Sequence, residues 1–161
     1  MLPRWHILFG AIFTILIWLA VPKINLLFLV LLFLATFLID FDHYATSVIK
    51  TRKLSLFHSF YYHDEMQKTE QKEKEKGIRT RGDFHILHTI EFHILVGLLS
   101  FFWVGFFYIF LGMMFHSLID IASLLFDDKM YRREFFFVNW LYKKLKKTNK
   151  PLGKKQESRH P

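Results

Sequence analysis

Apolar residues fill two long blocks of the chain. The first block contains two runs, Trp5–Val21 and Ile24–Ile39, with a short turn predicted at Pro22–Asn25 because proline continues a helix poorly. The runs are 16–17 residues long, whereas a helix needs about 20 residues to cross a membrane. Extension of the second run through Asp40–His43 supplies the missing turn. The pattern therefore predicts a tight transmembrane hairpin.

The second apolar block is Phe84–Phe126. Its 43 residues are too many for one membrane span and enough for two, and we expect the turn near Ser100–Gly105. The two blocks together predict an all-α fold, an up-down bundle of four transmembrane helices within residues 1–126.

The remaining segments are polar or amphipathic. The insertion Ala45–Asp83 contains an interfacial segment, Leu54–Tyr62, and a nearly all-polar stretch, Asp64–Asp83, that we expect to be a solvated helix or mobile linker without chemistry. In Asp127–Lys147, apolar residues recur at helical spacing among lysines, which predicts an amphipathic helix on the membrane surface. Thr148–Pro161 is predicted to be a disordered basic tail.

Composition and charge support this arrangement. Hydrophobic residues make up 52% of the chain although 22% of residues are charged, and the mean hydropathy is +0.21, which is typical of an integral membrane protein. With four spans, 21 of the 22 Lys and Arg residues lie on one side and only Lys23 lies opposite. The positive-inside rule makes that side, with both termini, cytoplasmic.

The net charge of +8 has two readings. A nucleic acid partner is disfavoured, because Lys50, Arg52 and Lys53 directly follow the second apolar run, where they would meet anionic lipid headgroups. Membrane lipids are therefore the predicted partners, with their anionic headgroups contacting Lys and Arg, and the sequence leaves protein partners unknown. The chain has no cysteine, which excludes disulfides and thiolate metal sites.

The ionisable groups of the apolar blocks all fall toward the cytoplasmic side. Asp40, Asp42 and His43 end the second helix, although an Asp at mid-membrane costs roughly 2.5–3.5 kcal/mol. A bound cation would offset that cost. The alternative is that these residues only mark where the lipid ends.

Helical spacing indicates which groups could meet. His116 and Asp120 lie about 40° apart on one helix face, and His85, His88 and Glu91 cover roughly 120° of another. The predicted ligands are His6, Asp40, Asp42, His43, His88, Glu91, His116 and Asp120. Imidazoles and carboxylates suit a divalent transition metal, Zn²⁺ first and Mn²⁺ or Fe as alternatives, and this number suggests one to three ions.

Two carboxylates are candidates for a catalytic role, Asp42 and Glu91, the latter as ligand or general base. Of the other histidines, we expect His93 to be a packing residue, since it projects some 160° from Glu91. His58 and His63 read as ordinary interfacial histidines.

Four segments resemble a known family. Trp5–Gly10, Ile39–His43, His88–Thr89 and Gly112–Asp120 are similar, in this order, to the landmarks of the YdjM-type membrane-bound metal-dependent hydrolases. Those proteins are distantly similar to zinc-dependent phospholipase C and P1 nuclease. The resemblance covers most of Met1–Phe126 and implies a helical enzyme with clustered metals that hydrolyses phosphoesters.

The chain departs from the family pattern at two places. The family has proline where this chain has Ile39, and its second motif, H-R-G-x-T-H-S, survives only as His85–Thr89, with Arg81 and Gly82 upstream. The role of His85 is therefore left open.

The function predicted from the sequence is a membrane metal-dependent hydrolase acting on a phospholipid or lipid-linked phosphate at the cytoplasmic face. The alternative is a non-catalytic metal-binding module, a carrier or a scaffold. A haem-binding bundle would leave Asp40, Asp42 and Asp120 unexplained.

Overall fold

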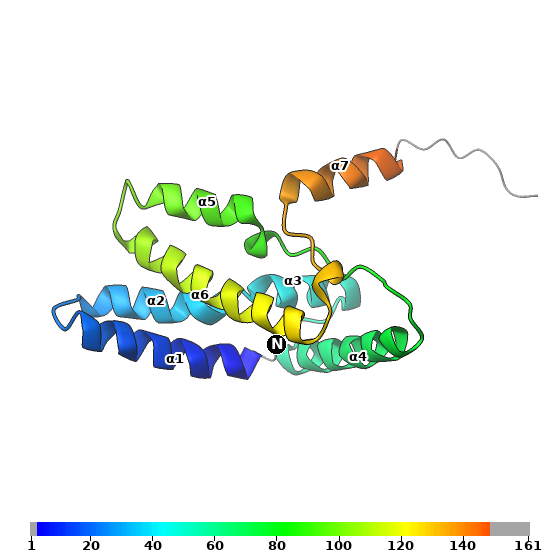
Figure 1. The fold of residues 1–161 in the computed structure, drawn as a ribbon, viewed down its shortest axis with the longest axis horizontal. Helices are drawn as coiled ribbons and strands as arrows, with labels where there is room; N and C mark the ends of the chain where they lie inside the picture. The colour runs from blue at the N-terminus through cyan, green and yellow to red at the C-terminus, as the bar shows by residue number, and fades with distance from the viewer. Residues whose placement is uncertain (1–2, 149–161) are drawn as a thin grey trace, which may run out of the picture.

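The regular elements of the described chain are all helical, as predicted (Figure 1). The computed structural model describes residues 3–148. Its helices are α1 (Pro3–Ala20), α2 (Leu26–Leu38), α3 (Phe41–Thr51), α4 (Leu56–Glu75), α5 (Ile90–Leu99), α6 (Gly105–Phe126) and α7 (Phe137–Thr148), with short 3₁₀ turns η1 (Ile86–His88) and η2 (Met130–Arg132).

Helix α6 lies at the centre of the bundle, where it packs on α1, α2 and α5 (Figure 1). Both turns lie where the apolar pattern places them, between α1 and α2 and between α5 and α6. The first is fixed by Asn25, whose side chain accepts a hydrogen bond from the Leu27 backbone N–H at 2.8 Å and so caps α2.

Helices α2 and α6 approach closely because glycine occupies the contact. A Cβ atom added at Gly112 would overlap the carbonyl oxygen of Leu32 and lie 2.8 Å from the Cβ of Ala35. At Gly10 of α1, an added Cβ would lie 2.8 Å from the Cβ of Thr36. The backbones of α1 and α6 therefore meet α2 around a short stretch that ends at Thr36.

Two helical segments of the described chain are long and apolar enough to cross a membrane. They are Leu26–Thr51, which joins α2 and α3, and α6. The apolar part of α1, Trp5–Ala20, and helix α5 are shorter. The ten residues of α5 extend only about 15 Å. Four full spans therefore stay a prediction.

The start of α5 differs from the sequence prediction. His85, His88 and Glu91 were expected on one helix face, but His85 is extended, His88 is in the η1 turn and Glu91 is in the first turn of α5. The helix begins late because the Thr89 side chain caps it, accepting from the Phe92 N–H. The Leu87 N–H instead donates to Asp42 at 3.1 Å.

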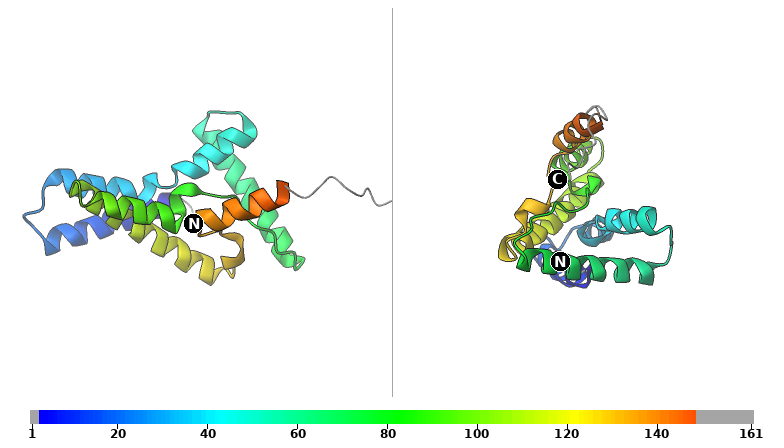
Figure 2. Two further views of the ribbon diagram at one scale, coloured as in Figure 1. Left: turned by 90° about the horizontal axis from the view of Figure 1, so that it is seen from above. Right: turned by 90° about the vertical axis from the view of Figure 1, so that its right-hand side faces the viewer.

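The charged insertion is ordered over most of its length. Helix α4 joins the predicted interfacial segment to the first part of the polar stretch, and Figure 2 shows α3 and α4 projecting to one side of the other helices. The buried Arg132 guanidinium donates to Glu70 at 2.9 Å and lies 3.6 Å from Glu73. The insertion therefore holds the segment that follows α6.

The amphipathic helix begins ten residues later than predicted, at Phe137. Glu134, just before it, contacts Arg81 and accepts from Asn139 at 2.5 Å and Lys143 at 2.8 Å. Partial burial opposes ionisation, but Lys143 and Asn139 hold the pKa of the Glu134 carboxyl below its usual value. From residue 149, the predicted tail lies outside the described residues.

The contact between α2 and α6 predicts that Gly112→Ala destabilises the protein. The added methyl group must displace the α2 backbone, which costs about 1–3 kcal/mol for overpacked sites. Thermal unfolding in detergent micelles measures the effect as a lower midpoint.

Gly97→Ala is the matched control, because its added Cβ meets only the Phe110 ring at an ordinary 3.5 Å. Equal midpoints for the two variants would show that the α2–α6 backbones are not in close contact.

Candidate metal centre

Ionisable side chains gather where α1, the α2–α3 junction, η1 and α6 meet. The buried members, with their exposed fractions, are His116 (0%), His6 (1%), His88 (5%), Asp120 (6%) and Asp42 (7%). Burial of charged groups costs several kcal/mol per ion unless they are paired or bind a metal. The cluster therefore needs a compensating interaction.

The break between α2 and α3 places the carboxylates. Asp40 lies at the N-terminus of α3, directly after the end of α2, and Asp42 lies in the first turn of α3. The partial positive charge of a helix N-terminus favours anions at both positions. Asp42 also accepts from the backbone N–H of Leu87, so the η1 turn is tied to this junction.

Two histidines are held in defined tautomers by their neighbours. His116 Nδ1 lies 2.8 Å from the Thr36 carbonyl oxygen, and His88 Nδ1 lies 3.1 Å from Asp42 Oδ2. Both oxygens only accept hydrogen bonds, so each Nδ1 carries the proton. In the neutral imidazoles, Nε2 of each ring is then left with its lone pair.

The Nε2 atoms of these two rings face each other. The Nε2 atoms of His88 and His116 are 3.1 Å apart. Asp40 Oδ1 lies 3.5 and 3.4 Å from them, and Asp120 Oδ2 lies 3.8 and 3.5 Å from them. Ligands about 2.05 Å from a tetrahedral Zn²⁺ are roughly 3.3 Å apart. Each carboxylate oxygen therefore lies at roughly the ligand spacing from both nitrogens, and His88, His116 and Asp120 together form one group that could hold a cation.

The cluster contains four overlapping groups of three residues. Within each group, the possible ligand atoms lie within 4.8 Å of one another. The groups are His6–Asp40–His116, Asp40–His43–His88, Asp42–His43–His85 and His88–His116–Asp120. The described residues could therefore hold a metal ion, and the overlap offers room for more than one.

Unpartnered buried atoms support the fit. His6 Nδ1, Asp42 Oδ1 and His85 Nδ1 are buried without a hydrogen-bond partner among the described residues. The last two lie 3.5 Å apart, and the His85 ring packs 3.7 Å from that of His43. Buried polar atoms normally have partners, so a cation between these groups would satisfy otherwise orphaned atoms.

The structure brings together seven of the eight predicted ligands and adds His85, whose role the sequence left open. Glu91 does not join them. Its carboxylate accepts from the backbone N–H groups of Phe137 at 2.9 Å and Val138 at 3.2 Å, so it caps α7. This contact is a structural role and not one in the metal cluster.

Other residues surround the cluster without joining it. His93 is buried, with Nδ1 2.8 Å from the Thr89 carbonyl and Nε2 2.9 Å from Ser117 Oγ, as a packing residue would be. His63 Nε2 donates to the His43 carbonyl at 3.1 Å. Arg133, which the sequence reasoning missed, donates to Asp120 Oδ2 at 2.6 Å.

Comparison of the chain with protein-family models, with curated proteins and with solved structures finds no match. The family resemblance seen in the motifs therefore stays a prediction. The side-chain geometry alone indicates a metal centre.

We expect the purified protein to bind at least one equivalent of Zn²⁺, and His88→Ala and His116→Ala to lose it. Both variants remove a lone pair directed at the common point. Elemental analysis after dialysis against micromolar Zn²⁺ measures the metal content.

Glu91→Gln and His58→Ala are the controls, since neither residue belongs to the four groups. Both should retain the wild-type metal content. A drop in Glu91→Gln equal to that in His116→Ala would contradict the assignment of Glu91 to the α7 cap.

Proposed function

We propose that this protein is an integral membrane hydrolase that uses divalent metal, Zn²⁺ first, to cleave a phosphoester at the cytoplasmic face. The observation that carries the proposal is the convergence of the His88 and His116 lone pairs with two carboxylates at one buried point. The resemblance to YdjM-type hydrolases, and through them to zinc-dependent phospholipase C, supports the same reaction class.

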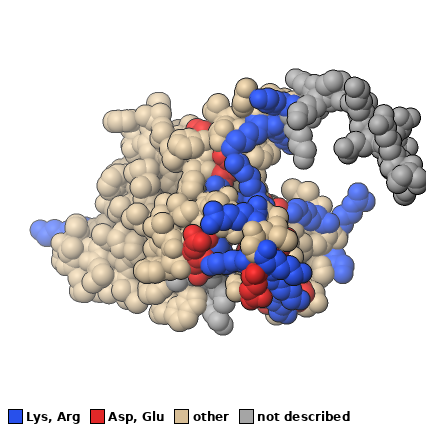
Figure 3. Space-filling view, turned by 45° about the vertical axis from the view of Figure 1, so that its right-hand side comes forward, with Lys and Arg blue, Asp and Glu red and all other residues tan. Residues whose placement is uncertain are grey.

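The distribution of apolar surface supports membrane insertion. Large apolar side chains are exposed along the bundle, among them Leu16 (58%), Trp18 (50%) and Leu118 (59%). An exposed apolar surface of this extent is unusual in a soluble monomer. Figure 3 shows most of the visible Lys and Arg, with some Asp and Glu among them, at one end of the molecule, beside a largely uncharged surface. Basic residues at one end fit the cytoplasmic side of a membrane.

Most of the cluster residues have a defined task in the proposed reaction. His6, Asp40, His43, His88, His116 and Asp120 would hold the metal, while Thr36 and Asp42 fix the tautomers of His116 and His88. Divalent metal in such a site supplies Lewis-acid chemistry for phosphoryl transfer to water. In the hydrolysis of a phosphomonoester, the hydroxyl of water bonds to phosphorus as the P–O bond to the alcohol breaks, the leaving oxygen takes the proton, and an alcohol and phosphate are released.

Two further groups assist at the edge of the cluster. Asp42 Oδ1 has no hydrogen-bond partner among the described residues, so it can accept a proton when no second cation is bound between Asp42 and His85. Arg133 uses one N–H for Asp120, and a guanidinium has about five N–H donors in all. Its remaining donors suit the oxygens of a phosphate group.

We expect Zn²⁺-loaded protein in mixed micelles to release phosphate from a lipid phosphate. A panel of phosphatidic acid, an isoprenyl monophosphate and p-nitrophenyl phosphate tests the reaction class. His116→Ala should lower kcat/KM at least about 100-fold, since it removes a ligand and its orientation.

His58→Ala serves as the control and should keep full activity. Metal binding without turnover of any compound in the panel would refute the hydrolase and favour the non-catalytic metal-binding module.

The proposed topology predicts opposite labelling of two single-cysteine variants. The chain has no cysteine of its own. In intact cells, a membrane-impermeant maleimide should label Lys23→Cys, in the turn between α1 and α2, but label Lys68→Cys, on α4, only after lysis. The same accessibility for both positions would overturn the topology.

A further inference from the structure

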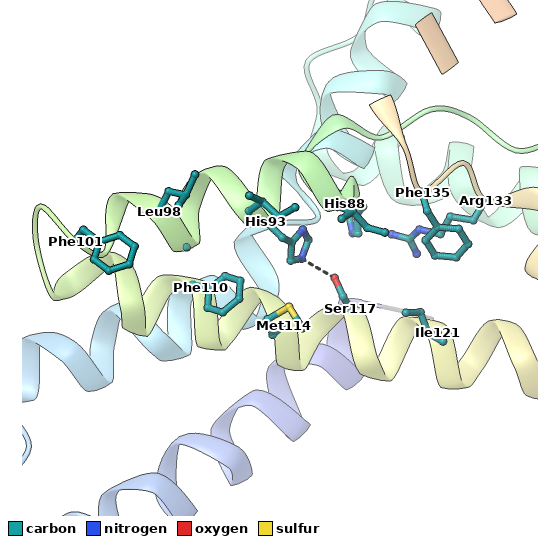
Figure 4. A pocket seen from close by; sticks show the side chains of 13 residues that line it. His88, His93, Leu98, Phe101, Phe110, Met114, Ser117, Ile121, Arg133 and Phe135 are labelled. Atoms are coloured by element: carbon teal, nitrogen blue, oxygen red, sulfur yellow. Dashed lines mark hydrogen bonds between the residues drawn. The ribbon is translucent and has the colours of Figure 1, made fainter. Parts of the chain in front are cut away.

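An apolar groove lies between α5 and α6. One end of the groove is next to the ionisable cluster, and the rest of it extends along the two helices. It has a volume of about 390 Å³, within the range of about 300–1,000 Å³ typical of ligand sites. Figure 4 shows His88 and Arg133 at one end of the groove and Leu98 and Phe101 at the other. The groove therefore begins at the proposed site and leads along the bundle.

The groove wall suits hydrocarbon. The polar side chains along its length are His93 and Ser117, which hydrogen-bond to each other at 2.9 Å, and His93 also pairs with the Thr89 carbonyl. The other lining residues beyond the polar end are apolar or glycine. A polar ligand would find few partners here, whereas an alkyl chain loses none.

The length of the groove and the exposure of its lining side chains match one leaflet of a membrane. From Ile90 to Phe101, α5 and its following turn extend roughly 16 Å, about half of the roughly 30 Å hydrocarbon core. Ile94 and Leu98 line the groove and are 55% and 54% exposed. The groove is thus open sideways, where lipid chains would lie.

The end of the groove next to the cluster carries a positive charge that suits a phosphate group. Arg133 lies there, 15% exposed, with its guanidinium on Asp120 of the cluster. Arginine pairs with phosphate oxygens in a planar, two-point geometry. The groove therefore joins a cationic end beside the cluster to an apolar channel.

We infer that this groove binds one alkyl chain of a membrane lipid whose phosphate headgroup lies against Arg133 and His88. This inference rests on the proposed function, which supplies the phosphoester bond that is hydrolysed. It narrows the substrate class to long-chain membrane lipids whose phosphate headgroup carries a net negative charge.

Photo-crosslinking tests the binding without turnover. The probe is a phosphonate analogue of phosphatidic acid, which cannot be hydrolysed at the P–C bond, with a diazirine near the end of its acyl chain. With the full-length protein in phosphatidylcholine nanodiscs, labelled peptides should map to α5 and the facing part of α6. A phosphatidylcholine probe with the same chain should label these peptides at least fivefold less.

Leu98→Trp and Leu95→Trp form a matched pair on α5. Leu98 lines the groove, whereas Leu95 does not, and their exposed fractions are 54% and 51%. Leu98→Trp should reduce labelling at least fivefold and Leu95→Trp less than twofold. If Leu98→Trp does not fold, Ile94→Trp replaces it, since Ile94 also lines the groove.

The two proposals fail separately. Equal labelling by the two probes, or equal labelling of the two variants, would overturn the groove assignment even if lipid phosphate is hydrolysed. Headgroup-selective labelling that Leu98→Trp abolishes supports the groove even if no substrate is turned over, and the hydrolase alone then fails.

Discussion

The arrangement depends on two imidazole nitrogens that face each other 3.1 Å apart inside the helix bundle. Thr36 and Asp42 hold the protons of these rings on the far nitrogens, so the facing atoms carry lone pairs. Without a proton on one of these atoms or a metal cation between them, such lone pairs would repel each other. Three separate elements, α2, η1 and α6, nevertheless bring them and their carboxylates together, which is reasonable only if a positive charge is shared there.

Close packing of α2 on α6 makes this geometry attainable. Gly112 removes the side chain that would separate the α6 backbone from Leu32 and Ala35. His116 follows Gly112 by about one helical turn, and Thr36 follows Ala35 directly. The Thr36 carbonyl can therefore reach the His116 ring at 2.8 Å. The close packing that Gly112 allows thereby determines which nitrogen of His116 is available to bind a metal.

The apolar pattern predicted the helical class, the two turns and the gathering of ionisable groups, because membrane spans and their ends depend on local composition. The pattern failed for residues whose position and role are determined by tertiary contacts. Glu91 has the spacing of a ligand but caps α7, whose N-terminus is 46 residues away. His85 and Arg133 lie in irregular segments, for which helical periodicity says nothing. For Arg133, the available signal was a charged side chain soon after the end of α6, the helix that carries His116 and Asp120.

The position of Arg133 follows from contacts that lie outside the bundle. The Ile90 N–H donates to the Phe135 carbonyl at 2.9 Å, so the segment before α7 runs beside the start of α5. Glu91 then caps α7, and Arg132 anchors the other side of the segment on α4. The surface helices thus hold Arg133 at the polar end of the groove. A charged insertion that carries no ligand is in this way still needed to complete the proposed site.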